Sequence, residues 1–574
     1  MSRSTRNLIN ILGTAIHGSR SACLRRTPCL LKNASTTSRS GPQRPRIVLP
    51  SIVFASSLLA STLLIDHATS TETHDDETEH DPNHVHNHGD NHSHQSKYIR
   101  LADVKAHDAT AEQKWIVKGS KVYDITDWIP NHPGGEVILR AAGTVVDPYW
   151  DIFTIHKKQD VYDILEQYCI GHIDPRDLVD GKVPADDIED PFQSDPERDP
   201  RLHIRSSRPM NSETDSHDLA TFITPNETFY VRNHLWVPHV DPKAFTLDIE
   251  LPDGEEIQYT LDDLKKKFDP VTVTATLQCS GNRRSHMNEQ ARPTNGLPWD
   301  VGAVSNAEWT GVRLRDVLAD AGLAVDGYDE EEAKHVQFQG MEAYGASIPI
   351  EKAVSRSGDV LLVYGMNGED IPRDHGYPLR VVVPGHVAAR SVKWLRKIVV
   401  TDEESSSQWQ QRDYKCFGPN QDANDIDWSM APAIQEMPVQ SAIISVQDAS
   451  PQKQTTTNTT TDATPAEDMI QVEGYAYSGG GRRIIRVDIS SDNGQSWSQA
   501  ELLDDDTKGH KAWAWKRWRF TVPKKSAGSQ FVVKAVDEGY NTQPEGYEAQ
   551  YNFRGNLTNS WHRVGKNEVA KDQS

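Results

Sequence analysis

The chain has 574 residues and a formal charge of −22, with 36% hydrophobic and 25% charged residues. That length allows about two to four globular domains plus tails. The acidic balance argues against a nucleic-acid partner, which requires a basic face. The five cysteines are scattered without CxxC spacing, so neither a zinc site nor a disulfide framework is indicated.

Residues 1–46 have the composition of a mitochondrial transit segment, with many arginines, serines and threonines and no acidic residue. Residues 47–65 then run for nineteen positions without a charge, which is long enough to cross a bilayer. A transit segment followed by an apolar stop predicts sorting to the mitochondrial intermembrane space. The alternative is a protein that stays anchored in the inner membrane, because an apolar span does not show whether it is cleaved.

Residues 66–96 are acidic and rich in histidine, and they lack apolar periodicity. This composition is typical of a disordered spacer. Histidine-rich tracts also bind transition metals, so a metal site here is the alternative.

Residues 97–174 form a small predicted domain around Asp127-Trp-Ile-Pro-Asn-His132-Pro-Gly-Gly135. Proline and paired glycines favour a tight loop that lets the backbone approach a flat ligand, with an imidazole at its edge. His156 follows twenty-four residues later. Either histidine alone would suit a structural role, but the loop and the spacing resemble the axial haem ligands of cytochrome b5 domains. Ligation of the iron by His132 and His156 would leave no open position, so this haem b is expected to carry electrons.

Residues 175–200 are acidic and proline-rich, with little apolar pattern. We interpret them as a linker. Its expected use is to let the haem domain swing; the alternative is a chain that merely crosses the surface.

Residues 201–403 show the mixed pattern of an α+β domain. Helices are predicted at 261–267 and 313–321. Strands are predicted at 245–250, 270–278, 360–364, 380–384 and 397–401.

One of these strands delivers Cys279 to the turn Ser280-Gly281-Asn282, with Arg283 and Arg284 beside it. Positive charge favours the thiolate, the form that binds a metal or acts as a nucleophile. A lone cysteine is more often inert and buried, so the thiol alone does not decide between these readings.

Residues 404–574 are dominated by short apolar runs between turns such as Asp492-Asn493-Gly494, a pattern typical of an immunoglobulin-like β-sandwich. The threonine-rich stretch 449–466 is predicted to be a disordered insertion. Strands are expected at 442–446, 470–474, 484–489, 513–520 and 530–535.

The run from Thr274 to Ser285 resembles the molybdenum-cofactor loop of eukaryotic sulfite oxidases and of the related plant and fungal nitrate reductases. Further motifs of that family follow in order: Tyr230-Val-Arg232-Asn-His234, Tyr344-Gly-Ala-Ser-Ile-Pro349, Pro372-Arg-Asp-His375-Gly, Arg380-Val-Val-Val-Pro-Gly385, Ser391-Val-Lys393-Trp394 and Gln411-Arg-Asp-Tyr414. The C-terminal part, including Tyr475-Ala-Tyr-Ser-Gly-Gly-Gly481 and Asn552-Phe-Arg554-Gly555, resembles the family's dimerisation domain. The resemblance implies a homodimer of multidomain α+β chains: a cytochrome b5-like haem domain, a molybdopterin domain and a β-sandwich.

By resemblance, Cys279 is the protein ligand of molybdenum, a metal that suits sulfur donors. The pterin and its phosphate would be held by Tyr230, Val231, Arg232, Asn233, His234, His375, Arg380, Ser391, Val392 and Lys393. Arg380 and Lys393 suit phosphate on charge alone. The chain departs from the animal enzymes before Tyr344, where a longer loop carries an aspartate; Glu342 is the expected stand-in.

A divalent oxyanion substrate calls for converging arginines. The resemblance offers Arg232, Arg284 and Arg554, with Trp299 as a wall and Tyr414 as a hydrogen-bond donor. Taken singly, each arginine could equally be a surface ion pair.

The resulting hypothesis is oxidation of sulfite to sulfate, with electrons leaving through the haem to cytochrome c. Nitrate reduction is the enzymatic rival, but in that family the molybdenum domain precedes the haem domain, and a flavin and nicotinamide module follows. A second rival is a haem-binding electron carrier whose molybdenum domain has become a scaffold; Cys279, Arg232, Arg284 and Tyr414 argue against it.

Overall fold

The computed structural model describes residues 97–129, 132, 135–185, 188–422, 426–449, 468–504 and 511–566. The expected transit segment, apolar segment and histidine-rich spacer lie outside those ranges, as does the threonine-rich insertion from residue 450 on. Across the described ranges, no helix combines the length and apolar character needed to span a bilayer.

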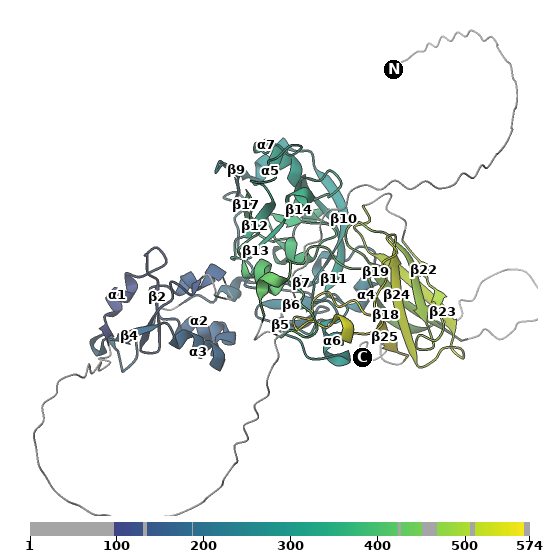
Figure 1. The fold of residues 1–574 in the computed structure, drawn as a ribbon, viewed down its shortest axis with the longest axis horizontal. Helices are drawn as coiled ribbons and strands as arrows, with labels where there is room; N and C mark the ends of the chain where they lie inside the picture. The colour runs from purple at the N-terminus through teal and green to yellow at the C-terminus, as the bar shows by residue number, and fades with distance from the viewer. Residues whose placement is uncertain are drawn as a thin grey trace, which may run out of the picture. The chain divides into compact units, whose positions relative to one another are not determined.

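The first described domain combines one sheet with short helices, as expected for residues 97–174 (Figure 1). Its strands are ordered β1-β4-β3-β2, with β1 parallel to β4 and the other pairs antiparallel. The bounds are β1 Tyr98–Ile99, β2 Trp115–Lys118, β3 Lys121–Asp124 and β4 Cys169–Ile173, with helices α1 Leu101–Lys105, α2 Asp147–Ile152 and α3 Gln159–Glu166 and 3-10 turns at Gly135–Ala141 and Thr154–Lys157.

The stretch 175–200 is fastened at both ends. Near its start, Asp177 accepts hydrogen bonds from the Arg100 guanidinium (2.6 and 2.8 Å). Near its end, Arg198 pairs with Asp374 of the following domain (2.8 Å). Both ends of the stretch therefore contact the neighbouring domains, and its use as a linker stays a prediction. Short 3-10 turns occupy Pro175–Asp177 and Pro191–Ser194.

The next domain is built on sheets whose strands come from distant parts of the chain. One sheet runs β10-β11-β14-β15 with β16 paired to β14, a second runs β13-β12-β17-β8-β9, and a short one runs β5-β6-β7. The strands span β5 His203–Ser207, β6 Met210–Glu213, β7 Val231–Arg232, β8 Thr246–Glu250, β9 Glu256–Thr260, β10 Val271–Gln278, β11 Val304–Arg313, β12 His335–Gly340, β13 Gly345–Pro349, β14 Leu361–Met366, β15 Glu369–Asp370, β16 Arg380–Val382 and β17 Leu395–Thr401. The strands predicted at 245–250, 270–278, 360–364, 380–384 and 397–401 are therefore confirmed, within a few residues.

Short helices flank these sheets. Helix α5 begins with a capping box, in which Thr260 accepts from the Asp263 amide and the Asp263 carboxylate accepts from the Thr260 amide. This local signal explains why the helix starts where the sequence predicts it. The helices span α4 Ser216–Leu219, α5 Leu261–Lys267, α6 Arg284–Gln290, α7 Leu314–Asp320 and α8 Ile350–Val354.

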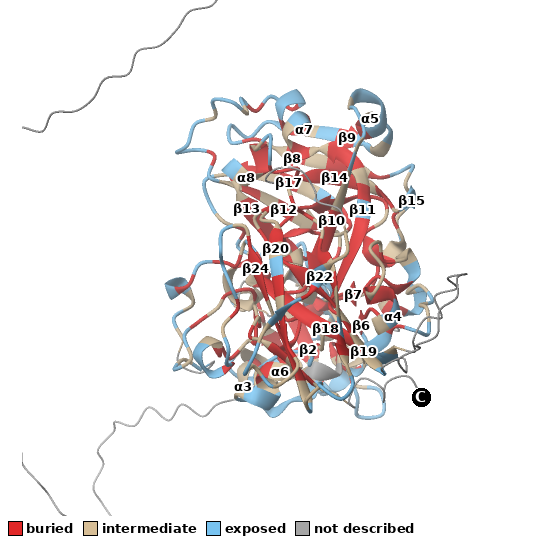
Figure 2. Cartoon of the chain, turned by 90° about the vertical axis from the view of Figure 1, so that its right-hand side faces the viewer, coloured by how far each residue is buried: buried red, intermediate tan, exposed pale blue. Residues whose placement is uncertain are grey.

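Strands carry most of the buried surface of this domain, whereas α5 and α7 expose one side (Figure 2). Apolar side chains of β8, β12 and β17, such as Leu247, Phe338 and Ile398, form the main core together with α7. A second cluster contains Phe229, Leu277, Trp299 and Trp309, and Cys279 packs within it.

The C-terminal domain consists of two packed sheets, ordered β18-β19-β23-β22 and β21-β20-β24-β25. Residues of both sheets, including Val472, Trp518, Val487 and Val533, share one apolar core, which confirms the expected sandwich. The run predicted at 513–520 enters its strand only at Lys516. The strands span β18 Gln440–Ala449, β19 Met469–Tyr477, β20 Ile484–Ser490, β21 Ser498–Gln499, β22 Glu501–Leu502, β23 Lys516–Pro523, β24 Gln530–Asp537 and β25 His562–Gly565.

Candidate active site

Cys279 follows directly on β10, and its side chain is 5% exposed. Its amide donates to the Ala303 carbonyl (3.0 Å), and its carbonyl accepts from the Asn282 amide (3.1 Å). The strand therefore ends in a closed turn that fixes the position of the sulfur. Helix α6 begins five residues later, after Arg283 in a left-handed conformation.

The C-terminal domain holds this loop from behind. Ser280 donates to the Asn556 side chain (2.8 Å), and the Asn282 amide group donates to the Tyr475 hydroxyl (2.9 Å). Hydrogen bonds to neutral groups are worth roughly 1 kcal/mol each, and these contacts fix the loop direction rather than add much stability. The sandwich thus contributes to the geometry around Cys279.

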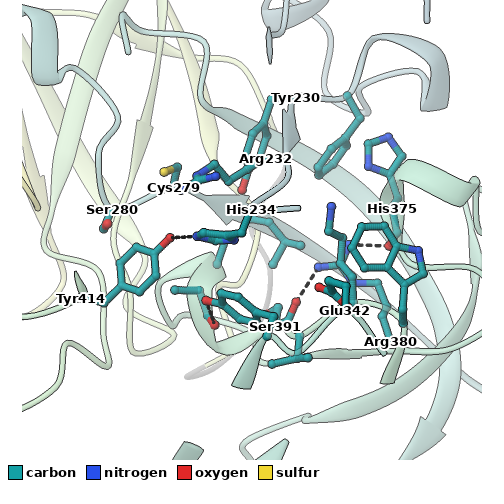
Figure 3. A pocket seen from close by; sticks show the side chains of 18 residues that line it. Tyr230, Arg232, His234, Cys279, Ser280, Glu342, His375, Arg380, Ser391 and Tyr414 are labelled. Carbon is teal, nitrogen blue, oxygen red and sulfur yellow. Dashed lines mark hydrogen bonds between the residues drawn. The ribbon is translucent and has the colours of Figure 1, made fainter. Parts of the chain in front are cut away.

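A pocket opens in front of the Cys279 sulfur (Figure 3). The expected residues that line it are Tyr230, Arg232, His234, Cys279, Glu342, His375, Arg380, Ser391, Val392, Lys393 and Tyr414. They come from the ends of β7, β10 and β16 and from loops up to 184 residues apart in sequence, between Tyr230 and Tyr414. The structure therefore brings most of the predicted residues to one place.

Two buried basic side chains, Arg380 and Lys393, line the pocket, and neither makes a direct ion pair with a carboxylate among the described residues. The Arg380 guanidinium donates only to carbonyl oxygens, those of His375 (2.8 Å), Ser391 (2.9 Å) and Val381 (3.5 Å), among the described residues. Burial lowers the pKa of Arg380 to about 10 and the pKa of Lys393 to about 7. Buried charges are costly unless an opposite charge joins them, so these side chains suit an anionic ligand.

Tyr414 and His234 form a hydrogen-bonded pair on the opposite wall, 2.9 Å between the hydroxyl oxygen and Nε2 (Figure 3). Burial, with Arg232 adding to it, holds the pKa of His234 well below its usual range, so the imidazole is neutral. The Arg232 guanidinium donates to the Asn233 carbonyl (2.6 Å) and the Asn211 side chain (3.1 Å). These contacts hold Arg232 and Tyr414 at the pocket.

Glu342 lines the pocket at its other end, and its Oε2 atom is buried without a hydrogen-bond partner in the described structure. Burial raises the pKa of the Glu342 carboxyl well above its usual range, which favours the protonated form. A protonated carboxyl can both donate and accept a hydrogen bond. The group is therefore positioned to bind a polar ligand.

Arg284, Trp299 and Arg554 are not among the lining residues. Arg284 is buried, and its Nε donates to the Arg554 carbonyl (2.9 Å). An added Cβ at Gly281 or Gly296 would overlap the Arg284 guanidinium, which explains why glycine stands at both positions. Burial lowers the pKa of Arg284 to about 10.

The guanidinium of Arg554 pairs instead with Asp413 (2.6 Å), the residue before Tyr414, and both side chains are 27% exposed. Trp299 is 1% exposed and packs in the apolar cluster that contains Cys279. The structure thus keeps these expected side chains near the loop but outside the pocket surface.

Val231 and Asn233 also lie behind the pocket wall, and both are buried. The sequence analysis assigned no role to several other lining residues: Phe229, Leu277, Ser280, Tyr344, Ala388, Ala389 and Trp394. Leu277, Ser280, Tyr344 and Trp394 stand within the quoted motifs, and Phe229 directly precedes one of them. Their position in the chain beside a predicted site residue is the signal by which the sequence could have indicated them.

The haem domain places His132 and His156 opposite one another, with ring centroids 6.1 Å apart and planes 12° from parallel. Each Nδ1 lies near a carbonyl oxygen, that of Gly135 (3.0 Å) or Phe153 (2.9 Å), so Nδ1–H is the donor. That tautomer leaves both Nε2 lone pairs free. Burial lowers the pKa of His132 to about 4 and also lowers the pKa of His156, which keeps both rings in the neutral, metal-binding form.

These residues fit the two cofactors implied by the sequence. Two neutral imidazoles at this separation suit a six-coordinate haem iron. A thiol, two buried basic side chains and a buried carboxyl suit a thiolate-bound metal with a phosphate-bearing pterin. Within the described residues, no cluster of three or more His, Cys, Asp or Glu side chains could hold a metal, so protein-only metal sites of that kind are not seen there.

Comparison with known families agrees with this division of the chain. Residues 100–174 match the cytochrome b5-like haem/steroid binding domain, residues 234–409 the oxidoreductase molybdopterin binding domain, and residues 431–568 the molybdenum-cofactor oxidoreductase dimerisation domain. Fold and site together define a molybdenum-cofactor oxidoreductase that carries a b-type haem domain.

The chain belongs to the sulfite oxidase family. It is 44% identical to the sulfite oxidase of Gallus gallus over 476 residues, which are 81% of this chain and 99% of that protein. It is 43% identical to the mitochondrial sulfite oxidase of Rattus norvegicus, covering 80% and 83% of the two chains. The crystal structure of the sulfane dehydrogenase SoxCD from Paracoccus pantotrophus superposes with a TM-score of 0.51 at 25% identity, covering 65% of this chain and 88% of that one.

Proposed function

We propose that this protein oxidises sulfite to sulfate and passes the electrons, one at a time, through its haem to cytochrome c. The observation that carries the proposal is the pocket in front of Cys279, where the thiol, Arg232 and the Tyr414–His234 pair meet buried cations. Sulfite and water give sulfate, two protons and two electrons, which reduce two molecules of ferricytochrome c. The molybdenum cofactor, when bound through Cys279, would supply the two-electron chemistry.

The protein groups around the sulfur have separate tasks in this proposal. Arg232 attracts the oxyanion at the pocket, while Arg284 and Arg554 add positive charge from behind the loop. Tyr414 donates a hydrogen bond to the bound anion from an orientation held by His234. Trp299 closes the apolar wall behind Cys279 and excludes water.

Cofactor contacts are assigned residue by residue. Arg380 and Lys393 would bind the phosphate, and His375, Ser391, Val392 and Tyr230 would contact the pterin; Val231, Asn233 and His234 would support them from the first motif. Glu342 would hydrogen-bond to the pterin with its protonated carboxyl. His132 and His156 would bind the haem iron.

We further propose the domain boundaries given above: a haem domain at 97–174, a linker at 175–200, the cofactor domain at 201–403 and the sandwich at 404–574. The match to a dimerisation domain supports a homodimer through the sandwich. Relatives named as mitochondrial support a mitochondrial location, and the composition of residues 1–65 favours the intermembrane space, with anchoring through 47–65 as the alternative.

The deciding experiment is an assay of the purified protein for sulfite-dependent reduction of ferricytochrome c. We expect turnover with sulfite and none with nitrate and a reduced dye as electron donor. Reduction of nitrate without oxidation of sulfite would overturn the assignment.

A further inference from the structure

The residue that closes the linker, Arg198, reaches the wall of the cofactor pocket. Its guanidinium donates two hydrogen bonds to the carboxylate of Asp374, from Nε (2.8 Å) and Nη2 (2.9 Å), and one to Asp195 (2.9 Å). The side chains of Arg198 and Asp374 are only 14% and 9% exposed. Removing one partner of a bidentate, largely buried pair is costly, because it leaves the other charge buried without compensation.

Asp374 in turn organises two groups at the pocket. Its Oδ1 atom accepts from the Asn233 side-chain amide (3.0 Å), and its backbone carbonyl accepts from Lys393 Nζ (2.8 Å). Lys393 also donates to the Asn233 side-chain oxygen. The result is a continuous path of hydrogen bonds from Arg198 in the linker to Lys393 in the pocket.

Which oxygen of Asp374 accepts the hydrogen bond from Lys393 decides whether the lysine is available to an anion in the pocket. Lys393 binds the backbone oxygen of Asp374, while the Asp374 carboxylate is occupied by Arg198 and Asn233. Without Arg198, the buried Asp374 carboxylate would lose its partner cation, and Lys393 already contacts that residue through its backbone oxygen. The lysine would then neutralise Asp374 instead of an anion in the pocket.

We infer that Arg198 is a positioning residue of the molybdenum site: by binding the Asp374 carboxylate, it keeps Lys393 available to the cofactor phosphate. The inference rests on the proposed cofactor contacts of Lys393 and Asn233. It also makes the end of the linker a structural part of the pocket and not merely a tether for the haem domain.

The same residues argue against a purely mechanical role for Arg198. Linker anchoring has other contacts: Asp195 accepts from the Val237 amide (3.0 Å), and Arg373 donates to the Ser194 carbonyl (2.9 Å). These two contacts do not involve Arg198. The distinct contribution of Arg198 is the neutralisation of Asp374.

The test compares molybdenum per chain, measured by elemental analysis after gel filtration of the full-length protein, in four forms. In Arg198→Met we expect molybdenum per chain to fall at least about tenfold below the wild type, in line with the loss of metal affinity when residues that support metal ligands are changed. Arg198→Lys should recover part of the loss. In the double variant Arg198→Met/Asp374→Asn, removal of the carboxylate charge should restore molybdenum above the level of Arg198→Met.

Arg208→Met is the matched control, because Arg208 pairs with Asp190 on the surface (2.7 Å, 56% exposed) and should leave molybdenum unchanged. Haem per chain, read from its absorbance, should be equal in all forms. Normal molybdenum retention in Arg198→Met overturns the inference, as does a double variant that loses molybdenum like the single one. If Arg198→Met does not fold, the double variant decides alone, since it must fold and retain metal. Wild-type protein that retains molybdenum but does not oxidise sulfite would instead count against the proposed function.

Discussion

At the scale of single residues, the thiol of Cys279 differs from the other described cysteines in its surroundings. It borders a pocket that holds Arg232, whereas burial raises the pKa of Cys416 to about 12 and keeps that thiol protonated. A thiol that stays protonated is a poor metal ligand. The contrast explains why one cysteine is assigned to the metal and another is not.

Cys279→Ser is expected to abolish sulfite oxidation while the haem spectrum stays intact, because sulfur donation and imidazole ligation lie in separate domains. The measurement is turnover with ferricytochrome c beside molybdenum and haem content. Cys416→Ser is the control and should keep most of the activity. Full activity in Cys279→Ser would refute the assignment of the metal ligand.

His386 gives a prediction of pH dependence. It is 5% exposed, and its Nδ1 has no hydrogen-bond partner within the described structure. Burial, with Lys352 and Arg390 adding to it, lowers the pKa of His386 from 6.5 to about 3. Below pH 6.5 the unfolded chain takes up a proton that the folded one refuses, so stability falls as the pH falls, by about 1.4 kcal/mol per unit.

Between pH 6.5 and pH 5 the unfolding free energy is expected to fall by roughly 2 kcal/mol because of His386. The variant His386→Gln should lack this part of the pH dependence. Urea titrations at pH 7 and pH 5 measure the difference. His239→Gln, at an exposed histidine, should retain the wild-type dependence. Identical acid dependence in His386→Gln and the wild type would contradict the prediction.

Site residues could be predicted from the sequence where they lie in a recognisable local motif. Cys279, Arg232 and His375 stand in contiguous motifs, and these motifs meet in the pocket. The Arg198–Asp374 pair joins residues 176 positions apart; Asp374 stands in one of the motifs, but nothing in that motif indicates Arg198 as its partner. The positions of Arg284 and Arg554 outside the lining depend on their own hydrogen bonds, which only the folded chain defines.

At the scale of elements, close approach of strands makes one glycine indispensable. An added Cβ on Gly474 in β19 would overlap the Ala442 carbonyl oxygen of β18 and the Trp518 ring of β23. The backbone there is extended, so the constraint is one of space. Glycine is therefore required by the packing of the sandwich.

Gly474→Ala should destabilise the sandwich by about 3 kcal/mol, because the core must shift to accept the methyl group. Thermal unfolding followed by tryptophan fluorescence would report the loss. Gly327→Ala is the matched control, since its Cβ would meet no atom within 4 Å. A melting temperature of Gly474→Ala equal to that of Gly327→Ala would show that the close contact is not real.

Elements with strong periodicity could be predicted and others could not. Helix α5 carries a capping box and β10 a β-branched run, and both lie where the sequence places them. Helix α6, Arg284–Gln290, was not among the predicted helices, because its residues are mostly polar and show no apolar face. Strand β11 mixes polar and apolar residues, so its own sequence does not indicate a strand. Its pairing with β10 and β14 stabilises the extended conformation.

At the scale of the whole molecule, the two sites are expected to act in series. His132→Ala or His156→Ala should remove turnover with cytochrome c but preserve turnover with a small oxidant that takes electrons directly from the molybdenum site. The reason is that each histidine supplies one of two neutral imidazoles, whose ring centroids lie 6.1 Å apart. Loss of either imidazole would leave a coordination position of the haem iron open. Steady-state rates with cytochrome c and with the small oxidant measure this difference. His172→Ala, in β4 of the same domain, is the control. Equal retention with both acceptors would refute the relay.

The net charge of −22 predicts how the protein meets its electron acceptor. An acidic protein attracts a basic one such as cytochrome c by long-range steering, which speeds encounter at low salt and is screened over about 8 Å at physiological ionic strength. Raising salt should therefore raise the apparent KM for cytochrome c. Anions also compete with sulfite for Arg232, so the sulfite dependence must be measured in parallel with an uncharged acceptor. With sulfite saturating, a cytochrome c dependence that stays flat from low to high ionic strength would exclude electrostatic steering.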